Sequence, residues 1–228
     1  MNPGLSFKAV LFDLDGTLVD TAPDLIGTLM ALRERSGLPA LESGQFRHHA
    51  SRGAAGLLEA GFADQPAADL AALRTDFLAH YQSNLWVRSQ AFECMEEVMA
   101  ALSGAGLKLA VVTNKPGFLT APLLDSAGWT DRFACVIAGD TVAHAKPHPE
   151  PVMEACRRLA LEPARCLFIG DDRRDVEAGR AAGVVTAVAG WGYLPPDEDS
   201  GEWGADWHFA EPADLLGLIA GVSSNETQ

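Results

Sequence analysis

The stretch that decides the fold reads SFKAVLFDLDGTLVD and spans residues 6–20. Its apolar run, Ala9–Phe12, has the length and bulk of a buried strand. Asp13 and Asp15 follow this run, and the carboxyl ends of strands in an open α/β sheet meet at the crevice where ligands bind. Two carboxylates this close repel each other unless a cation or strong donors lie between them. An ordinary Asp-Gly turn would account for the second aspartate but not for the first.

Short apolar runs alternate with helical patterns along most of the chain. Besides Ala9–Phe12, the predicted strands are Leu107–Val112, Ala134–Ile137, Cys166–Ile169 and Val184–Val188. The predicted helices between them are Glu93–Ser103, Gly117–Ala127, Glu150–Leu161 and Arg173–Ala182. Alternation of this kind, with almost continuously apolar strands, predicts a parallel sheet covered on both faces. The expected fold class is therefore a three-layer, Rossmann-like α/β core.

One segment, residues 21–86, breaks this alternation. It contains no convincing strand, and helical patterns cover Asp24–Ser36, Ala54–Ala60 and Ala67–Gln82. The sequence thus predicts a core domain made of residues 1–20 and 87–228, with a helical cap domain at 21–86. Because the insertion directly follows the two aspartates, we interpret it as a lid over them. The alternative is a helical subdomain that takes no part in the site.

Polar residues also follow the strand predicted to end at Val112. Thr113 and Asn114 can donate hydrogen bonds to an anion there, although Thr-Asn also makes good turns. Lys146 lies in a loop between polar residues, with prolines at 147 and 149 just before a predicted helix. A single Lys-Pro pair on its own would be interpreted as a solvated surface lysine beside a rigid turn.

A second acidic group follows the strand that ends near Gly170. It contains Asp171, Asp172 and Asp175. Acids in the first turn of a helix complement its dipole, which is the simpler explanation. Together with Asp13 and Asp15, however, they form the oxygen-rich set that Mg²⁺ prefers. A carboxylate can also act as a nucleophile toward phosphorus, while a lysine and a hydroxyl offset the charge on the transferred group.

Four motifs in this order, DxDGTL, VVTN, KP and GDDxxD, resemble those of the haloacid dehalogenase superfamily. The resemblance covers essentially the whole chain, and it implies a three-layer α/β core with a helical cap inserted after the first strand. It implies Asp13 as nucleophile and Asp15 as general acid and base. It further implies the following sites: Thr113, Asn114 and Lys146 for the phosphoryl group; Asp13, the backbone carbonyl of Asp15, and Asp171 for Mg²⁺; Asp172 and Asp175 as supports of Lys146 or of the metal's waters.

Members of this superfamily catalyse different reactions, and the residues argue against one of them. Haloalkanoate dehalogenases of this superfamily lack the second carboxylate and need no metal, whereas this chain has Asp15 and the acids around Asp171. The resemblance therefore favours a Mg²⁺-dependent phosphatase acting through an aspartyl-phosphate. A phosphomutase, which uses the same core, stays open, as does a non-catalytic binding protein with this fold.

The closer resemblance is to two related groups of phosphatases. The beginning of the chain is similar to phosphoglycolate phosphatases. Later phrases, such as VVTNKP, KPHPEP and GYLPPDE, are more similar to N-acetylmuramic acid 6-phosphate phosphatases. Both substrates carry a carboxylate, and the predicted cap contains the cationic segment RHHASRG at residues 47–53. We expect Arg52 and Gly53 to contact the substrate. The alternative for the whole segment is solvated cap residues.

Composition narrows the partners. A net charge of −14 argues against nucleic acid or an anionic membrane surface as a partner, but not against a small anionic substrate. The expected partner is therefore the small phosphomonoester that the resemblance implies. Four cysteines without C-x-x-C spacing predict buried free thiols in a reducing cytoplasm. No transmembrane stretch or signal peptide is evident, so a cytoplasmic monomer or homodimer is expected.

Overall fold

Six strands form one parallel sheet in the computed structural model, which describes residues 7–65 and 68–220. The sheet order is β5-β4-β1-β6-β7-β8, with β1 in the interior. In that order the strands are Cys135–Ile137, Lys108–Val112, Ala9–Phe12, Cys166–Gly170, Val185–Ala189 and Trp207–Phe209. Ala9 pairs with Lys108 on one side and with Cys166 on the other. The carboxyl ends of β4, β1 and β6 are therefore neighbours.

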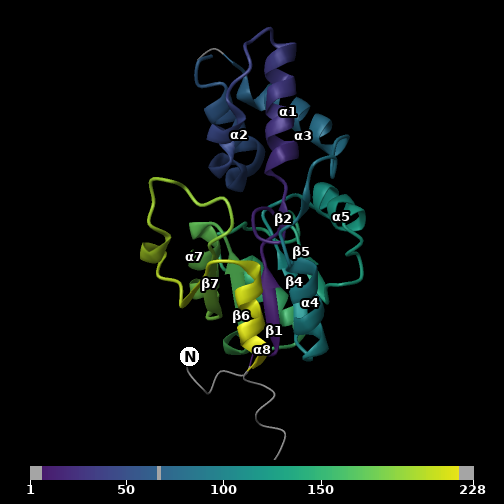
Figure 1. Cartoon of the computed structure of the whole chain (residues 1–228), viewed down its shortest axis with the longest axis vertical. Helices are drawn as coiled ribbons and strands as arrows, with labels where there is room; N and C mark the ends of the chain where they lie inside the picture. Colours follow the sequence, from purple (N-terminus) through teal and green to yellow (C-terminus); the bar gives the residue numbers. More distant parts are fainter. Residues whose placement is uncertain (1–6, 66–67, 221–228) are drawn as a thin grey trace, which may run out of the picture.

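Helices cover both faces of this sheet (Figure 1). Successive residues of a strand point to opposite faces. Val10 and Phe12 belong to the hydrophobic cluster that includes helix α4, Met95–Gly104, whereas Ala9 and Leu11 belong to the cluster beneath α6. On this second face lie α6, Glu150–Leu159, and α7, Arg173–Ala182. The chain therefore has the three layers predicted for it.

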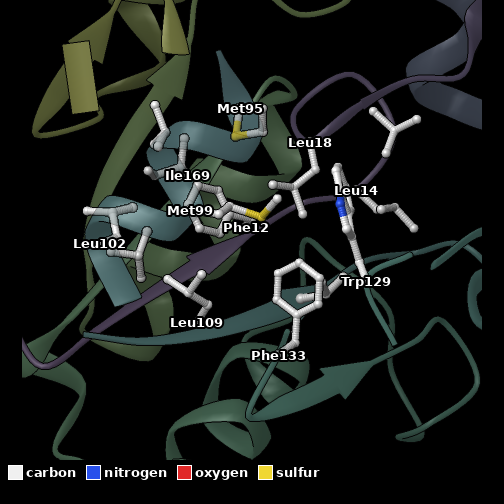
Figure 2. Close-up of a cluster of buried hydrophobic side chains, with 14 of the residues drawn as sticks. Phe12, Leu14, Leu18, Met95, Met99, Leu102, Leu109, Trp129, Phe133 and Ile169 are labelled. Atoms are coloured by element: carbon white, nitrogen blue, oxygen red, sulfur yellow. The ribbon is translucent and has the colours of Figure 1, made fainter. Parts of the chain in front are cut away.

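Figure 2 shows the first of these clusters. Phe12 and Ile169 from the sheet meet Met95, Met99 and Leu102 of α4, and all five are almost completely buried. Each such side chain contributes about 1.5–3 kcal/mol when it leaves water. This packing holds the strand ends, and hence the polar residues that follow them, in fixed positions.

Three helices, α1, α2 and α3, lie together beyond the carboxyl ends of the strands (Figure 1). They span Ala22–Arg35, Gly53–Gly61 and Leu70–Gln82. Leu29, Leu57 and Phe77 are fully buried in a hydrophobic cluster separate from those of the sheet. A packed core of their own makes these helices a distinct layer above the sheet.

The chain leaves the sheet layer and returns to it at one place. The short strands β2, Val19–Asp20, and β3, Gln90–Ala91, pair antiparallel there. The Asp24 carboxylate accepts hydrogen bonds from the backbone N–H groups of residues 87, 88 and 89 at 2.8–3.0 Å. Outgoing and returning segments are thereby fixed to each other at the base of the helical layer.

The predicted elements are confirmed, with their ends shifted by up to three residues. Helix α3 begins at Leu70 because Asp69 accepts bonds from the N–H groups of Ala71 and Ala72 as an N-cap; the predicted first residue, Ala67, lies outside the described residues. Helix α6 ends at Leu159, since Ala160 has a left-handed backbone with φ of +54°. Strand β8 was not predicted, because three residues among polar neighbours carry too little periodicity.

The remaining elements are short, apart from α5, which spans Gly117–Ser126. They are α8, Gly217–Ala220, and five 3₁₀ turns: Ser43–Phe46, His48–Arg52, Pro163–Arg165, Ser200–Trp203 and Pro212–Leu216. No helix among the described residues is both long and apolar enough to cross a membrane.

The prediction of four buried thiols is wrong for part of the set. Cys156 and Cys166 are buried, but Cys135 is only partly buried and Cys94 is exposed. Cys94 lies in a left-handed conformation, φ +61°, immediately before α4. Its side chain is therefore outside the apolar stripe that begins at Met95.

Candidate active site

The predicted residues converge at the carboxyl edge of the sheet. Asp13 follows β1, Thr113 follows β4 and Asp171 follows β6, and these three strands are adjacent. Lys146 joins them from the loop before α6, and Asp175 joins them from the first turn of α7. Residues spread over more than 160 positions of the chain thus form one site.

Lys146 is the central cation of this site. Its Nζ lies 2.9 Å from Asp13 Oδ1 and 2.7 Å from Asp175 Oδ1, and it donates to the carbonyl of Val112 at 2.8 Å. Its side chain is 2% exposed. Burial opposes the charge, but the two carboxylates outweigh that effect and raise the pKa of Lys146 above its usual value. The lysine is therefore a permanent positive charge beside Asp13.

Three carboxylates surround this lysine's end of the pocket. One oxygen each of Asp13, Asp171 and Asp175 lies within 4.8 Å of the others. Burial, reinforced by the charges of its two neighbours, raises the pKa of Asp171 well above its usual value. Burial also raises the pKa of Asp175 to about 7, against the opposing effect of Lys146. A hard divalent cation such as Mg²⁺ would offset the repulsion between these buried carboxylates, and their oxygens are the ligands that it prefers.

Neighbouring groups hold Asp171 in place. It accepts hydrogen bonds from the Thr17 hydroxyl at 2.9 Å and from the N–H of Tyr193 at 2.8 Å. Gly16, at φ +84°, lies so close that a Cβ there would be 2.1 Å from Asp171 Oδ2. Only glycine fits this turn, which explains the glycine of the DxDG motif by a close approach as well as by conformation.

Thr113 and Asn114 have different roles in the structure. The Thr113 hydroxyl accepts a bond from the N–H of Lys115 at 3.2 Å, which leaves its own proton free to donate into the pocket. The Asn114 amide instead pairs twice with the backbone of Lys146, each time at 2.9 Å. We predicted that Asn114 binds the phosphoryl group, but in the structure its amide holds the loop that carries Lys146.

Asp15 has two partners that were not predicted. Its carboxylate accepts from Lys115 Nζ at 3.0 and 3.3 Å and from the Thr21 hydroxyl at 2.6 Å. Lys115 also lies 3.0 Å from the hydroxyl of Tyr81, on α3. The Lys115 side chain is 5% exposed, and Asp15 and Tyr81 outweigh the effect of burial to raise its pKa. A signal existed, since Lys115 directly follows the Thr-Asn pair at a strand end.

The two acids expected to support Lys146 separate in the structure. Asp175 contacts the lysine, whereas Asp172 caps α7 and pairs with the guanidinium of Arg174 at 2.7 and 2.8 Å. Arg174 also donates to the carbonyl of Ser51 at 2.9 Å. This contact joins the sheet layer to the helices above it, and the prediction from sequence did not include it.

A cavity of about 160 Å³ lies between the two layers. Its floor contains Asp13, Asp15 and Lys146, and α1 and α3 supply an apolar wall that includes Leu25, Phe77 and Leu78. Arg52, Gly53 and Arg74 also line the cavity.

The two arginines of this cavity are in different states. Arg52 forms an ion pair with Glu59 at 2.7 Å, and both side chains are 52% exposed. Arg74, on α3, has no ion pair or hydrogen bond to any other described residue. Gly53 has φ of +58°, a backbone conformation that favours glycine. Of the predicted site residues, all but Asp171 line this cavity, and Asp171 lies behind its floor, close to Asp13 and Asp175. Arg74, which was not predicted, is a lining cation without an ion pair among the described residues.

The site combines carboxylates at the end of an interior parallel strand with a buried lysine, and a helical layer lies above both. This combination is typical of one family of hydrolases. The family model of haloacid dehalogenase-like hydrolases matches residues 7–183. The chain belongs to this family, and the resemblance seen in the sequence is confirmed.

The chain is similar to relatives with two different names. N-acetylmuramic acid 6-phosphate phosphatase of Pseudomonas putida is 43% identical over 216 residues, covering 94% of this chain and 97% of the relative. Phosphoglycolate phosphatase of Xanthomonas campestris is 41% identical, covering 91% and 94%. A crystal structure from Haemophilus somnus, described as a predicted phosphoglycolate phosphatase, has a TM-score of 0.85 at 29% identity, covering 94% and 98%.

Proposed function

We propose that this chain is a Mg²⁺-dependent phosphatase that hydrolyses a small, carboxylate-bearing phosphomonoester. One observation carries the proposal: Asp13, Asp175 and Lys146 line a cavity that the helical layer covers, with Asp171 close behind them. The family supports a hydrolase, and the relatives' names support a phosphoric monoester as its substrate.

Asp13, the backbone carbonyl of Asp15, and Asp171 would hold Mg²⁺ in this proposal. The ion would neutralise charge on the phosphoryl oxygens and on the carboxylates around it. Lys146 and the Thr113 hydroxyl would contact the remaining phosphoryl oxygens, because both line the cavity beside Asp13. Asp175 would stay bound to Lys146 and fix its position.

The reaction proceeds in two displacements at phosphorus. An oxygen of Asp13 attacks, the bond from phosphorus to the alkoxide breaks, and Asp15 gives a proton to the leaving oxygen. Asp15, now ionised, then takes a proton from a water molecule that attacks the aspartyl-phosphate. Inorganic phosphate leaves, and Asp13 is regenerated. Lys115 and Thr21 hold Asp15 through this change of charge.

Charge and apolar surface in the cavity support the substrate class. Neither the floor residues nor Mg²⁺ can distinguish one phosphomonoester from another, so selection falls to the helical layer. We infer that Arg74, rather than the Arg52 that sequence reasoning favoured, binds the carboxylate, because Arg52 is already paired with Glu59. Phosphoglycolate has no methyl group to pack against the apolar wall around Phe77, whereas an N-acetylated sugar acid has such groups. This difference favours N-acetylmuramic acid 6-phosphate as the substrate.

A matched pair of substrates tests this proposal. N-acetylglucosamine 6-phosphate differs from N-acetylmuramic acid 6-phosphate by the absence of the O-lactyl group, which carries the carboxylate. Arg74→Ala should lower kcat/KM for the sugar acid by about ten- to a hundredfold, the effect of one charge-assisted hydrogen bond. It should leave kcat/KM for N-acetylglucosamine 6-phosphate, which has no carboxylate, nearly unchanged. Arg52→Ala is the control, with a smaller effect on both. An equal loss on both substrates would assign Arg74 to phosphate binding or to folding.

The phosphatase chemistry needs its own test. Wild type should release inorganic phosphate from a chromogenic phosphomonoester only with Mg²⁺ present, and Asp13→Asn should release none. Phosphate release also separates a phosphatase from a phosphomutase, which returns the group to the sugar. Full activity after thorough chelation would contradict the proposed metal site.

A further inference from the structure

A second group of metal-ligating side chains lies outside the cavity, in the loop between β5 and α6 and at the first residue of α6. This loop reads AHAKPHPE over residues 143–150, so His144, His148 and Glu150 follow one another at spacings of four and two. His144 Nδ1 lies 2.7 Å from Glu150 Oε2, and His148 Nδ1 lies 4.0 Å from the same oxygen. The two imidazole rings stack with their centroids 4.4 Å apart. Each residue offers one ligand atom within 4.8 Å of the others.

These separations fit a tetrahedral ion. Zn²⁺ binds nitrogen and oxygen at about 2.0–2.2 Å, so two ligands of one tetrahedral ion lie about 3.4 Å apart. The observed 2.7 and 4.0 Å lie on either side of that value. Small rotations of exposed side chains would bring all three donors to it.

The backbone of the loop also holds the donors near one another. Glu150 Oε2 accepts a hydrogen bond from the backbone N–H of His144 at 3.0 Å, and the backbone N–H of Glu150 donates to His148 Nδ1 at 3.2 Å. The His144 and His148 side chains are 63% and 50% exposed, so an ion from solvent reaches them without any opening of the structure. Binding at His148 Nδ1 would replace its hydrogen bond from the N–H of Glu150 with a bond to the metal, and the other donors would need only small side-chain rotations.

We propose that His144, His148 and Glu150 bind one divalent transition-metal ion of the zinc class. Two imidazoles and one carboxylate form a donor set that suits Zn²⁺, Ni²⁺ or Cu²⁺, with water completing the coordination. This chemistry differs from that of the all-carboxylate group around Asp13, which suits Mg²⁺. The site lies on the outer side of the loop that carries Lys146, and it does not depend on the function proposed above.

Titration of the full chain with Zn²⁺ tests the proposal. Metal is first removed by chelation, and millimolar Mg²⁺ is then kept present to occupy the carboxylate group in the cavity. Isothermal titration calorimetry should show one Zn²⁺ per chain. His144→Ala and His148→Ala should each weaken binding at least tenfold. Loss of a residue that only hydrogen-bonds to a metal ligand typically costs 10- to 100-fold in affinity, and loss of the ligand itself should cost no less. Glu150→Gln should weaken binding as well, because an amide is a poorer ligand.

Two further measurements make the test specific. Co²⁺ in place of Zn²⁺ should give a visible absorption band with wild type that is absent from the double variant H144A/H148A. His208→Ala is the matched control, because His208 is also exposed and bonds Ser200 far from this loop. Circular dichroism checks that each variant is folded. Binding that is unchanged in H144A/H148A, or no saturable Zn²⁺ binding by wild type at up to about 1 mM, would overturn the proposal and leave Glu150 as a simple hydrogen-bond acceptor at the start of α6.

Discussion

Replacing Asp171 by asparagine should stabilise the metal-free protein and remove its response to Mg²⁺. The substitution is nearly isosteric and keeps both hydrogen bonds. The amide oxygen can still accept from the N–H of Tyr193, and the amide nitrogen can donate to the Thr17 hydroxyl, which can turn to accept. What changes is the charge, because Asp171 lies within 4.8 Å of ligand oxygens on Asp13 and Asp175.

The size of the effect follows from these distances. Two unit charges 4.8 Å apart repel by about 3.5 kcal/mol at an effective dielectric constant of about 20. The folded protein avoids part of this cost by keeping carboxyl protons, which is why the pKa of Asp171 and that of Asp175 are raised. We therefore expect a gain of about 1–3 kcal/mol in the free energy of unfolding at pH 8, with roughly 2–4 °C in Tm for each kcal/mol.

The gain must depend on pH in a defined direction. The pKa of Asp171 is raised in the folded state above the ordinary value of 3.8, so the stability that its proton provides is complete below about pH 4. That stability is lost as the pH rises through the folded-state pKa. The advantage of Asp171→Asn over wild type should therefore be near zero at pH 4, grow with pH, and level off above the folded-state pKa.

Thermal unfolding with chelator and with Mg²⁺, at several pH values, measures both effects. Mg²⁺ at a thousand times its Kd should add about 4.1 kcal/mol to wild type and little to the variant, which reverses their order of stability. Asp131→Asn is the control, since Asp131 is exposed on the surface. A variant less stable than wild type in chelator at pH 8, or an advantage that does not change with pH, would refute the electrostatic reasoning.

Three further outcomes are expected. Lys115→Met removes the cation bonded to Asp15 and should lower kcat on an alkyl phosphate by about 10- to 100-fold, but less on an activated aryl phosphate, whose leaving group needs little protonation; equal losses on both would count against a role through Asp15. Arg33→Met removes the hydrogen bonds from a fully buried guanidinium to the Gly61 carbonyl and to Asp64, and should lower the free energy of unfolding in urea by about 2–4 kcal/mol. Arg35 is exposed on the same helix, so Arg35→Met should change that free energy by no more than about 0.5 kcal/mol. Asp13→Asn should abolish phosphate release yet leave Tm in chelator unchanged or higher, because the buried negative charge is reduced; a large fall in Tm would mean that activity was lost through unfolding.

The order of apolar runs and turns was enough to predict the sheet and the main site residues. An apolar run such as Ala9–Phe12 is a local signal, and the residue after it must lie at a strand end. Parallel strands end at one edge of a sheet, so Asp13, Thr113 and Asp171 were expected at the same edge. The strand order, which makes their three strands neighbours, came from the structure. Lys146 was assigned to the site through the family resemblance, because a Lys-Pro pair by itself indicates a solvated surface lysine.

Partners within the site were decided by tertiary structure alone. Lys115 and Asp15 are a hundred positions apart, and nothing in the sequence near either one indicates the other. Asp172 and Asp175 are separated by less than one helical turn along the chain. Asp172 nevertheless caps α7 and pairs with Arg174, whereas Asp175 pairs with Lys146 inside the site.

The same distinction separates Arg52 from Arg74. Both arginines line the cavity, but Arg52 forms an ion pair with Glu59 and Arg74 has no ion pair with any described residue. The sequence by itself therefore determined which residues reach the carboxyl edge of the sheet, because strand ends follow from local patterns. Which side chain contacts which was left to the packing of helices against the sheet, because the direction of a side chain depends on neighbours distant in the sequence.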